Sequence, residues 1–200
     1  MHVSADKFEI KRLSISTEGE GDSRRVVLKY DYKKKGVNIL HLALDKECYI
    51  TCKGVYEETY GVDNVKTGKH VTTFILDKKS SADKILYNVL TSIYEKIQKY
   101  DKRKTVNFPM RENEDESICY MYCKFIEGKN EVIYTKAFDS DRNMLELVNL
   151  RKCLCRPLFS ISYPITKLDK ANVRFSIFEM EVNKILESGY SLLDEDQDEP

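Results

Sequence analysis

The stretch SSADKILYNVLTSIYEKIQKY, residues 80–100, is the longest helical pattern in the chain. Ser80 followed three residues later by Asp83 is a capping-box pattern, in which side chains bond the free backbone N–H groups of the first turn. Apolar residues then recur at steps of three and four, which places them on one face of a helix. They are Ala82, Leu86, Val89, Leu90, Ile93 and Ile97. The sequence therefore predicts an amphipathic helix about 30 Å long.

Most of the remaining chain has the pattern of β-strands. Apolar or alternating segments bounded by turn residues occur at 24–32, 37–44, 71–76, 117–126, 131–138, 153–165 and 171–182. We also expect an extended first segment at 7–16, a long irregular loop from about residue 54 to 69, and a short helix at 144–150. The fold class predicted is mostly β (α+β), with one long helix between strands and a single domain over residues 1–193.

Two features of the late strands predict local irregularity. In 171–182 the apolar residues change parity, which predicts a bulge or a barrel corner. The odd-numbered set is Val173, Phe175 and Ile177, and the even-numbered set is Phe178, Met180 and Val182. Pro157 and Pro164 cannot donate to a ladder, so 153–165 is expected at an edge or with its pairing confined between them.

Charge is unevenly distributed along the chain. The last seven residues hold five acids and no Lys or Arg, namely Asp194, Glu195, Asp196, Asp198 and Glu199. The first 193 residues then hold 28 acidic residues against 33 basic ones, a formal surplus of about five positive charges. We expect a mildly basic body with a flexible acidic tail. No apolar h-region or membrane-length apolar run is found, which predicts an intracellular protein without a signal peptide or a transmembrane segment.

The six cysteines are expected to be reduced and mostly buried. Their spacings are C-x3-C, C-x3-C and C-x-C, which differ from the pairs of a zinc ribbon. Cys119, Met121 and Cys123 share one face of a predicted strand, as buried small side chains would. Asp139 and Asp141 fit a turn better than a metal pair, and no nucleophile, base and orienting group come together in sequence. We expect no metal, no cofactor and no enzymatic activity.

Nucleic-acid binding is the chemistry that the sequence supports best. Single-strand binders combine cations along the backbone path with aromatic faces on which bases stack. The segment 118–138 reads as a hairpin with Tyr120, Tyr122 and Lys124 on one strand and Tyr134 and Lys136 on the other. The alternative is that these tyrosines pack inside the protein, because tyrosine is a good strand former.

Further basic and aromatic residues would extend this track. They are Lys33, Lys34 and Lys35 at a hairpin tip, Tyr56, Tyr60 and Lys69 in the predicted loop, and Arg151, Lys152 and Arg156. Each set is also compatible with an ordinary solvated surface. The tail, tethered near a basic groove, would compete with DNA at high effective concentration and, when released, bind basic partner proteins.

The order of elements resembles a known family. A strand runs directly into the long helix (HVTTFILDKKSSADKILYNVLTSIYEKI, 70–97), and a hairpin follows (SICYMYCKFIEGKNEVIYTKAF, 117–138). Two late strands (LFSISYPITKLDKANVRFSIFEMEV, 158–182) precede the acidic end LLDEDQDEP (192–200). This order is similar to that of single-stranded DNA-binding proteins of the oligonucleotide-binding (OB) barrel type from short-tailed phages and large eukaryotic DNA viruses, including poxviruses.

The resemblance implies a five-stranded OB-like Greek-key barrel with the helix between strands three and four and extra C-terminal strands. It also implies non-sequence-specific binding of single-stranded DNA in viral DNA replication or recombination, at a cytoplasmic replication site or in the host nucleus. Through the same resemblance, the tail would bind replication proteins or mediate homodimerisation. The alternatives are a protein–protein interaction or virulence module with a β-sandwich fold, and a binder of single-stranded RNA.

Overall fold

Five strands close into a barrel at the centre of the computed structural model, which describes residues 1–20, 25–60, 64–101, 105–128, 132–164 and 170–186. The barrel strands are β6 (Ile50–Tyr60), β7 (Val65–Asp77), β10 (Ile118–Phe125), β13 (Cys153–Pro164) and β15 (Arg174–Ile185). Around the ring, β13 pairs β6, β6 pairs β7, β7 pairs β10, β10 pairs β15, and β15 pairs β13 again. The β10–β15 pair is parallel, and the other four are antiparallel.

This ring is the connectivity of an OB-type Greek-key barrel, so the predicted fold class is confirmed. The β-sandwich alternative is wrong, because the sheet closes on itself through the β13–β15 pair. The place of the helix needs one correction. Counted along the barrel strands, α1 (Ser81–Tyr100) follows the second strand, β7, and precedes the third, β10, rather than lying between the third and fourth.

The predicted helix is confirmed over nearly its whole length. Its buried face carries Leu86, Val89, Leu90, Ile93 and Ile97, five of the six stripe residues. The cap differs from the prediction, because the Ser80 side chain makes no cap hydrogen bond. The buried carboxylate of Asp83 instead accepts the backbone N–H of Asp77 at 2.8 Å, which ties the end of β7 to the first helical turn.

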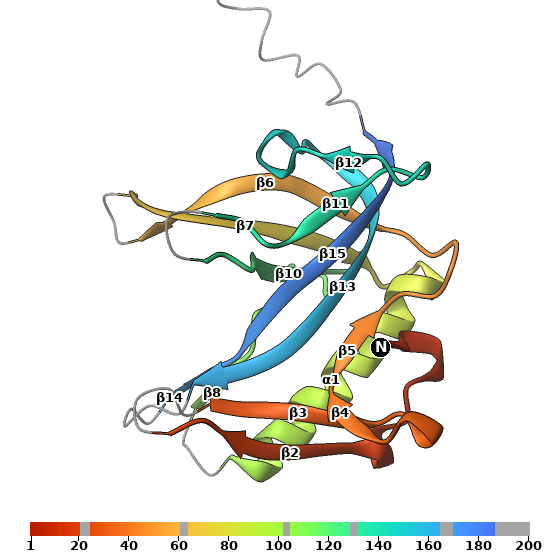
Figure 1. Cartoon of the computed structure of the whole chain (residues 1–200), viewed down its shortest axis with the longest axis vertical. Helices are drawn as coiled ribbons and strands as arrows, with labels where there is room; N and C mark the ends of the chain where they lie inside the picture. Colours follow the sequence, from red (N-terminus) through yellow and green to blue (C-terminus); the bar gives the residue numbers. More distant parts are fainter. Residues whose placement is uncertain (21–24, 61–63, 102–104, 129–131, 165–169, 187–200) are drawn as a thin grey trace, which may run out of the picture.

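The N-terminal strands extend the barrel on one side of β13. They are β1 (Val3–Ser4), β2 (Leu13–Glu18), β3 (Arg25–Asp31), β4 (Val37–Ile39) and β5 (His41–Ala43). β3 and β5 pair with β13, and in Figure 1 these strands and α1 lie together below the barrel. The expected extended segment at 7–16 is only partly strand. It holds the 3-10 turns η1 (Ala5–Lys7) and η2 (Ile10–Arg12) before β2 begins.

Three other predictions are corrected by the strand pairing. The expected loop at 54–69 lies mostly in the long β6–β7 hairpin. The expected second strand of the 118–138 hairpin is short, because β11 (Lys136–Phe138) pairs with β15 and β12 instead of β10. The expected helix at 144–150 is β12 (Met144–Leu145) followed by the 3-10 turn η6 (Leu147–Asn149). The few apolar residues of segment 144–150 fit one short turn as well as they fit a helix.

The remaining short elements are η4 (Lys33–Lys35), β8 (Thr105–Asn107), β9 (Met110–Glu112) and β14 (Lys170–Asn172). β9 pairs with β10, and β8 pairs with β14. No helix in the described part of the chain is long and apolar enough to cross a membrane.

The bulge predicted in 171–182 is confirmed. Leu158 pairs with Glu179 and Phe159 with Ile177, so Phe178 is the extra residue of a bulge on β15. The bulge shifts the alternation by one residue, so Met180 and Val182 face the core like the odd-numbered set. Phe178 itself lies against His41, with ring centres 4.6 Å apart. Pro157 lies between the β13 residues that pair with β6 and those that pair with β5. β13 is a central strand that also pairs before Pro157, so both the edge position and the confinement of pairing between Pro157 and Pro164 are wrong.

A second bulge, which the sequence analysis missed, lies on β6. Cys52 pairs with Phe74 and Val55 with Thr72, so three steps on β6 oppose two on β7. Gly54 sits inside this bulge with φ +100°, a conformation that favours glycine. A Cβ at this position would lie 2.9 Å from the carbonyl oxygen of Leu150, which also accepts the Val55 N–H at 2.9 Å.

Gly54→Ala should therefore destabilise the protein more than a matched glycine substitution. Gly36 also has positive φ (+74°), but a Cβ there would meet nothing within 4 Å. We expect Gly36→Ala to lower the free energy of unfolding by about 1–3 kcal/mol from backbone strain alone. Gly54→Ala should lower it further, because the Leu150–Arg151 backbone must move. Urea denaturation of both variants measures this, and equal losses would contradict a steric role for Gly54.

Candidate nucleic-acid interface

Strand β10 presents one apolar row to the core and one polar aromatic row outward. Cys119, Met121 and Cys123 are fully buried, as the sequence alternation predicted. Tyr120, Tyr122 and Lys124 alternate with them and are half-buried on the outer face. Their partners on β7 are Ile75, Thr73 and Val71. Tyr120 and Tyr122 therefore do not point into the barrel core.

Strand β6 adds three side chains to the same outer face. The Lys53 ammonium lies 4.7 Å from the centre of the Tyr120 ring, a cation–π distance. The Tyr56 hydroxyl lies 2.6 Å from the Thr73 hydroxyl, and 41% of Tyr56 is exposed. Glu58 reaches β10, as described below. Since Lys53 and Tyr56 lie on either side of the Gly54 bulge, the bulge keeps both on one face despite their odd spacing.

Glu58 is the acidic member of this face. Its Oε1 accepts hydrogen bonds from the Tyr122 hydroxyl at 2.8 Å and from the Lys124 ammonium at 2.6 Å. Burial opposes ionisation of Glu58, but these two bonds and the nearby charges of Lys124 and Lys69 outweigh it and hold its pKa below the ordinary value. Burial, and then the bond to Glu58, raise the pKa of Tyr122, so its phenol stays neutral.

A shallow hollow lies beside the two tyrosines. It has a volume of about 260 Å³ and is walled by Pro109, Met110 and Arg111 on one side and by Tyr120 and Tyr122 on the other. Arg111, on β9, is exposed and pairs directly with Tyr120 across the ladder. We call the set Lys53, Tyr56, Glu58, Lys69, Arg111, Tyr120, Tyr122 and Lys124 the tyrosine face.

Two residues of the predicted hairpin do not join the β10 row. Tyr134 is 61% exposed, but it follows β10 in a turn, where its N–H donates to the Ile126 carbonyl at 2.7 Å. Lys136 lies on β11 opposite Glu179 of β15. The two strands of 118–138 therefore do not form one continuous platform, because β15 lies between β10 and β11.

The other predicted residues fall in several places. Lys69 is exposed and close enough to Glu58 to lower its pKa, so it belongs to the tyrosine face. Lys33 and Lys35 are exposed on η4, in the connection between β3 and β4. Arg156 is held by the Glu181 carboxylate at 2.5 Å. The side chains of Lys34 and Tyr60 lie outside the described part, as do tail residues Asp194, Glu195, Asp196, Asp198 and Glu199.

Arg151 and Lys152 form a flank next to the tyrosine face. Both are exposed, and the Arg151 backbone packs against Gly54, one residue from Lys53.

The sequence analysis missed three members of the tyrosine face, namely Lys53, Glu58 and Arg111. The available signal was the sequence Lys53-Gly54, because a glycine inside a strand marks a bulge that changes which residues face outward.

The barrel is similar to solved structures. A C-terminally truncated single-stranded DNA-binding protein from bacteriophage Enc34 matches 87% of this chain and 97% of its own, with a TM-score of 0.50 and 11% identity. The single-stranded DNA-binding protein gp2.5 of bacteriophage T7 matches 74% of this chain and 93% of its own, with a TM-score of 0.45 and 11% identity. No protein-family model and no curated sequence matches the chain.

The bonds of Glu58 predict a pH-dependent stability difference. Because its folded-state pKa is lowered, its contribution is present above the unfolded pKa near 4.5 and is lost as pH falls through the folded value. Glu58→Gln should lower the free energy of unfolding by about 1 kcal/mol at pH 7, and the difference should shrink as pH falls below the unfolded pKa. Urea denaturation at a series of acidic pH values measures this. Glu95→Gln, on the exposed side of α1, is the control, and a Glu58 difference that does not change with pH would refute the assignment.

Proposed function

We propose that the protein binds single-stranded DNA on the tyrosine face, without sequence specificity and without catalysing a reaction. The observation that carries this is the outward row Tyr120 and Tyr122 on β10, with Lys53 over one ring and Arg111 across the ladder. Stacking platforms flanked by cations are what a flexible polyanion with unpaired bases requires.

The position of the row in the barrel supports the same function. β7 and β10 are the second and third strands of the barrel, and OB barrels bind oligonucleotides on the face of these two strands. The similar structure from bacteriophage Enc34 is named a single-stranded DNA-binding protein, which agrees with the proposal. Every base has a π-face, so stacking on Tyr120 and Tyr122 would accept any sequence.

Glu58 gives this face a built-in competitor for phosphate. In the free protein, its carboxylate holds both the Tyr122 hydroxyl and the Lys124 ammonium. A phosphate that binds Lys124 must displace this carboxylate or bind beside it, at a cost in affinity. Lys53, Lys69 and Arg111 are exposed cations of the face for which the described residues show no such carboxylate contact. Four cations would give a salt slope of about −3 on a single strand.

We place this binding in DNA replication or recombination, as part of a viral protein, and infer that the acidic tail modulates binding to DNA and to replication proteins. Residues 1–193 form the binding domain in this proposal, with homodimerisation as a further role of the tail. Lys33, Lys34, Lys35, Tyr60, Tyr134, Lys136, Arg151, Lys152 and Arg156 stay predicted extensions of the track. RNA is the second candidate ligand, because a stacking face also accepts RNA bases.

The direct test is fluorescence anisotropy of a labelled 30-nucleotide oligothymidine, titrated at two salt concentrations. We expect salt-sensitive binding that a duplex of equal length competes for poorly. Tyr120→Ala and Tyr122→Ala should each weaken binding by roughly 5- to 150-fold, corresponding to about 1–3 kcal/mol per stacked base.

Tyr100→Ala is the matched control, because Tyr100 is exposed at the end of α1 and outside the tyrosine face. Its affinity should equal that of the unmodified protein. Absence of binding at low salt would refute the proposal and favour the protein-interaction alternative. Tighter binding of oligouridine than of oligothymidine would favour RNA.

Deletion of residues 194–200 tests the tail. Five negative charges tethered to a basic surface compete with DNA, so their removal should tighten oligothymidine binding and reduce inhibition by free polyanions. The same anisotropy titration measures both effects. A variant with the five acids replaced by Asn or Gln separates charge from length. Unchanged affinity in both variants would exclude competition by the tail.

A further inference from the structure

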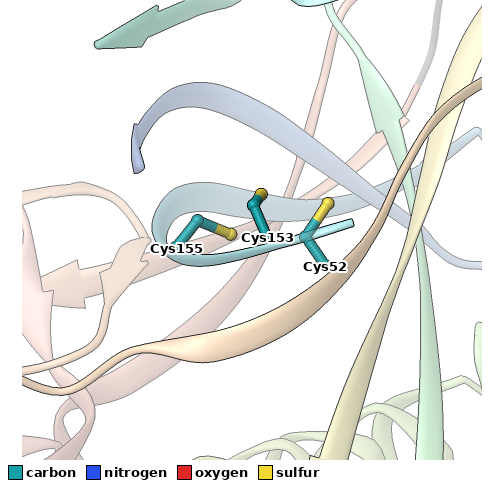
Figure 2. Close-up of side chains that lie close together, drawn as sticks. All are labelled: Cys52, Cys153 and Cys155. Atoms are coloured by element: carbon teal, nitrogen blue, oxygen red, sulfur yellow. The ribbon is translucent and has the colours of Figure 1, made fainter. Parts of the chain in front are cut away.

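Three cysteines from two distant parts of the chain meet inside the barrel. Cys52 is on β6, and Cys153 and Cys155 are on β13, where Cys52 and Cys153 are direct ladder partners. Their sulfur atoms all lie within 4.8 Å of one another, and all three residues are fully buried. Figure 2 shows the three side chains gathered between the two strands. The cysteine spacings did not reveal this cluster, because Cys52 belongs to one closely spaced pair and Cys153 and Cys155 form another pair much later in the chain.

The surroundings of Cys52 are more polar than those of an ordinary core cysteine. The Gly54 N–H donates to its sulfur at 3.3 Å. The fully buried Thr72 hydroxyl lies 3.1 Å from the same sulfur. That hydroxyl donates its one hydrogen to the Gly54 carbonyl at 2.7 Å, so towards Cys52 it can only accept. The β6 bulge therefore fixes the position of the Cys52 sulfur from two sides.

The three sulfur atoms are close enough to one another to bind a single ion. A bound cation deprotonates coordinating thiols outright and offsets part of the negative charge of the resulting thiolates.

We propose that Cys52, Cys153 and Cys155 form a three-thiolate site for a soft monovalent cation, with Cu(I) as the fitting ion. Thiolates select soft ions such as Cu(I), Zn(II) and iron–sulfur clusters. Structural zinc is almost always held by four ligands, and the cluster offers no fourth His, Cys, Asp or Glu within the described residues. A site of three sulfurs without a fourth His, Cys, Asp or Glu ligand therefore favours Cu(I) over zinc.

Such an ion would tie β6 to β13 directly behind the tyrosine face. Cys52 precedes Lys53, and Cys153 follows Arg151 and Lys152 by one or two residues. The bound ion would also stabilise the folded protein, because the three sulfurs come together only when β6 and β13 pair. This inference does not depend on the proposed DNA binding.

The test is anaerobic titration of the reduced full-length protein with Cu(I), in competition with a chromogenic Cu(I) chelator. We expect one equivalent to be taken from the chelator and X-ray absorption to show three sulfur neighbours. At a free ion concentration 100 times the Kd, the melting temperature should rise by roughly 5–10 °C. Zn(II) should compete poorly. Preferential binding of Zn(II) at these thiols would overturn the assignment to Cu(I).

Serine variants locate the site. Cys52→Ser should reduce the sulfur coordination from three to two, and the double variant Cys153→Ser, Cys155→Ser should lose the bound equivalent. Cys119→Ser is the matched control, because Cys119 is equally buried but lies on β10, outside the cluster. Circular dichroism identifies any variant that fails to fold. If the Cys153 variant does not fold, the Cys52 coordination number decides the question. Three sulfur neighbours still present in Cys52→Ser, or no uptake by the unmodified protein, would refute the site.

Discussion

The one-residue bulge at Gly54 is the constraint on which both sides of the barrel wall depend. Successive side chains of a strand point to opposite faces, so an extra residue reverses the pattern that follows. Before the bulge, Cys52 faces the core and Lys53 faces outward; after it, Tyr56 and Glu58 contact the outer row of β7 and β10. A regular strand would turn Tyr56 and Glu58 toward the core. The carbonyl of Leu150 accepts the Val55 N–H, so the segment before β13 helps to hold the bulge in place.

The electrostatics of the tyrosine face follow from this geometry. Bringing Glu58 onto the outer face supplies an internal counter-charge for Lys124 and an acceptor for the Tyr122 hydroxyl. Both β10 side chains are then held in one orientation before any ligand arrives, which lowers the entropy lost on binding. The same carboxylate repels phosphate. The tyrosine face therefore combines rings held in one orientation with a positive charge that Glu58 partly neutralises. This agrees with the small surplus of basic over acidic residues in 1–193.

The sequence predicted those features that depend on periodicity within one segment. The stripe of α1, the alternation Cys119 to Lys124 and the parity change at Phe178 are all local patterns, and each was confirmed. The errors concern which strands become neighbours. The β6–β7 hairpin was mistaken for a loop because Gly54 and Gly68, both with positive φ, interrupt its pattern. The pairing of β11 with β15, and the meeting of Cys52 with Cys153 and Cys155, depend on barrel closure between segments far apart in sequence. No spacing within a segment carries that information.

The two sites are coupled by being adjacent along β6. Cys52 belongs to the interior cluster and Lys53 to the outer face, and the Gly54 N–H that donates to the Cys52 sulfur belongs to the bulge that orients Tyr56. Any change in charge or ligation at the cluster therefore acts on a hydrogen bond inside the bulge. A cation that fixes the sulfur positions also fixes the backbone of residues 52–54, which restricts Lys53 over Tyr120. Thus the interior cluster can influence the tyrosine face, the proposed binding surface, through three consecutive residues, without any larger rearrangement of the strands.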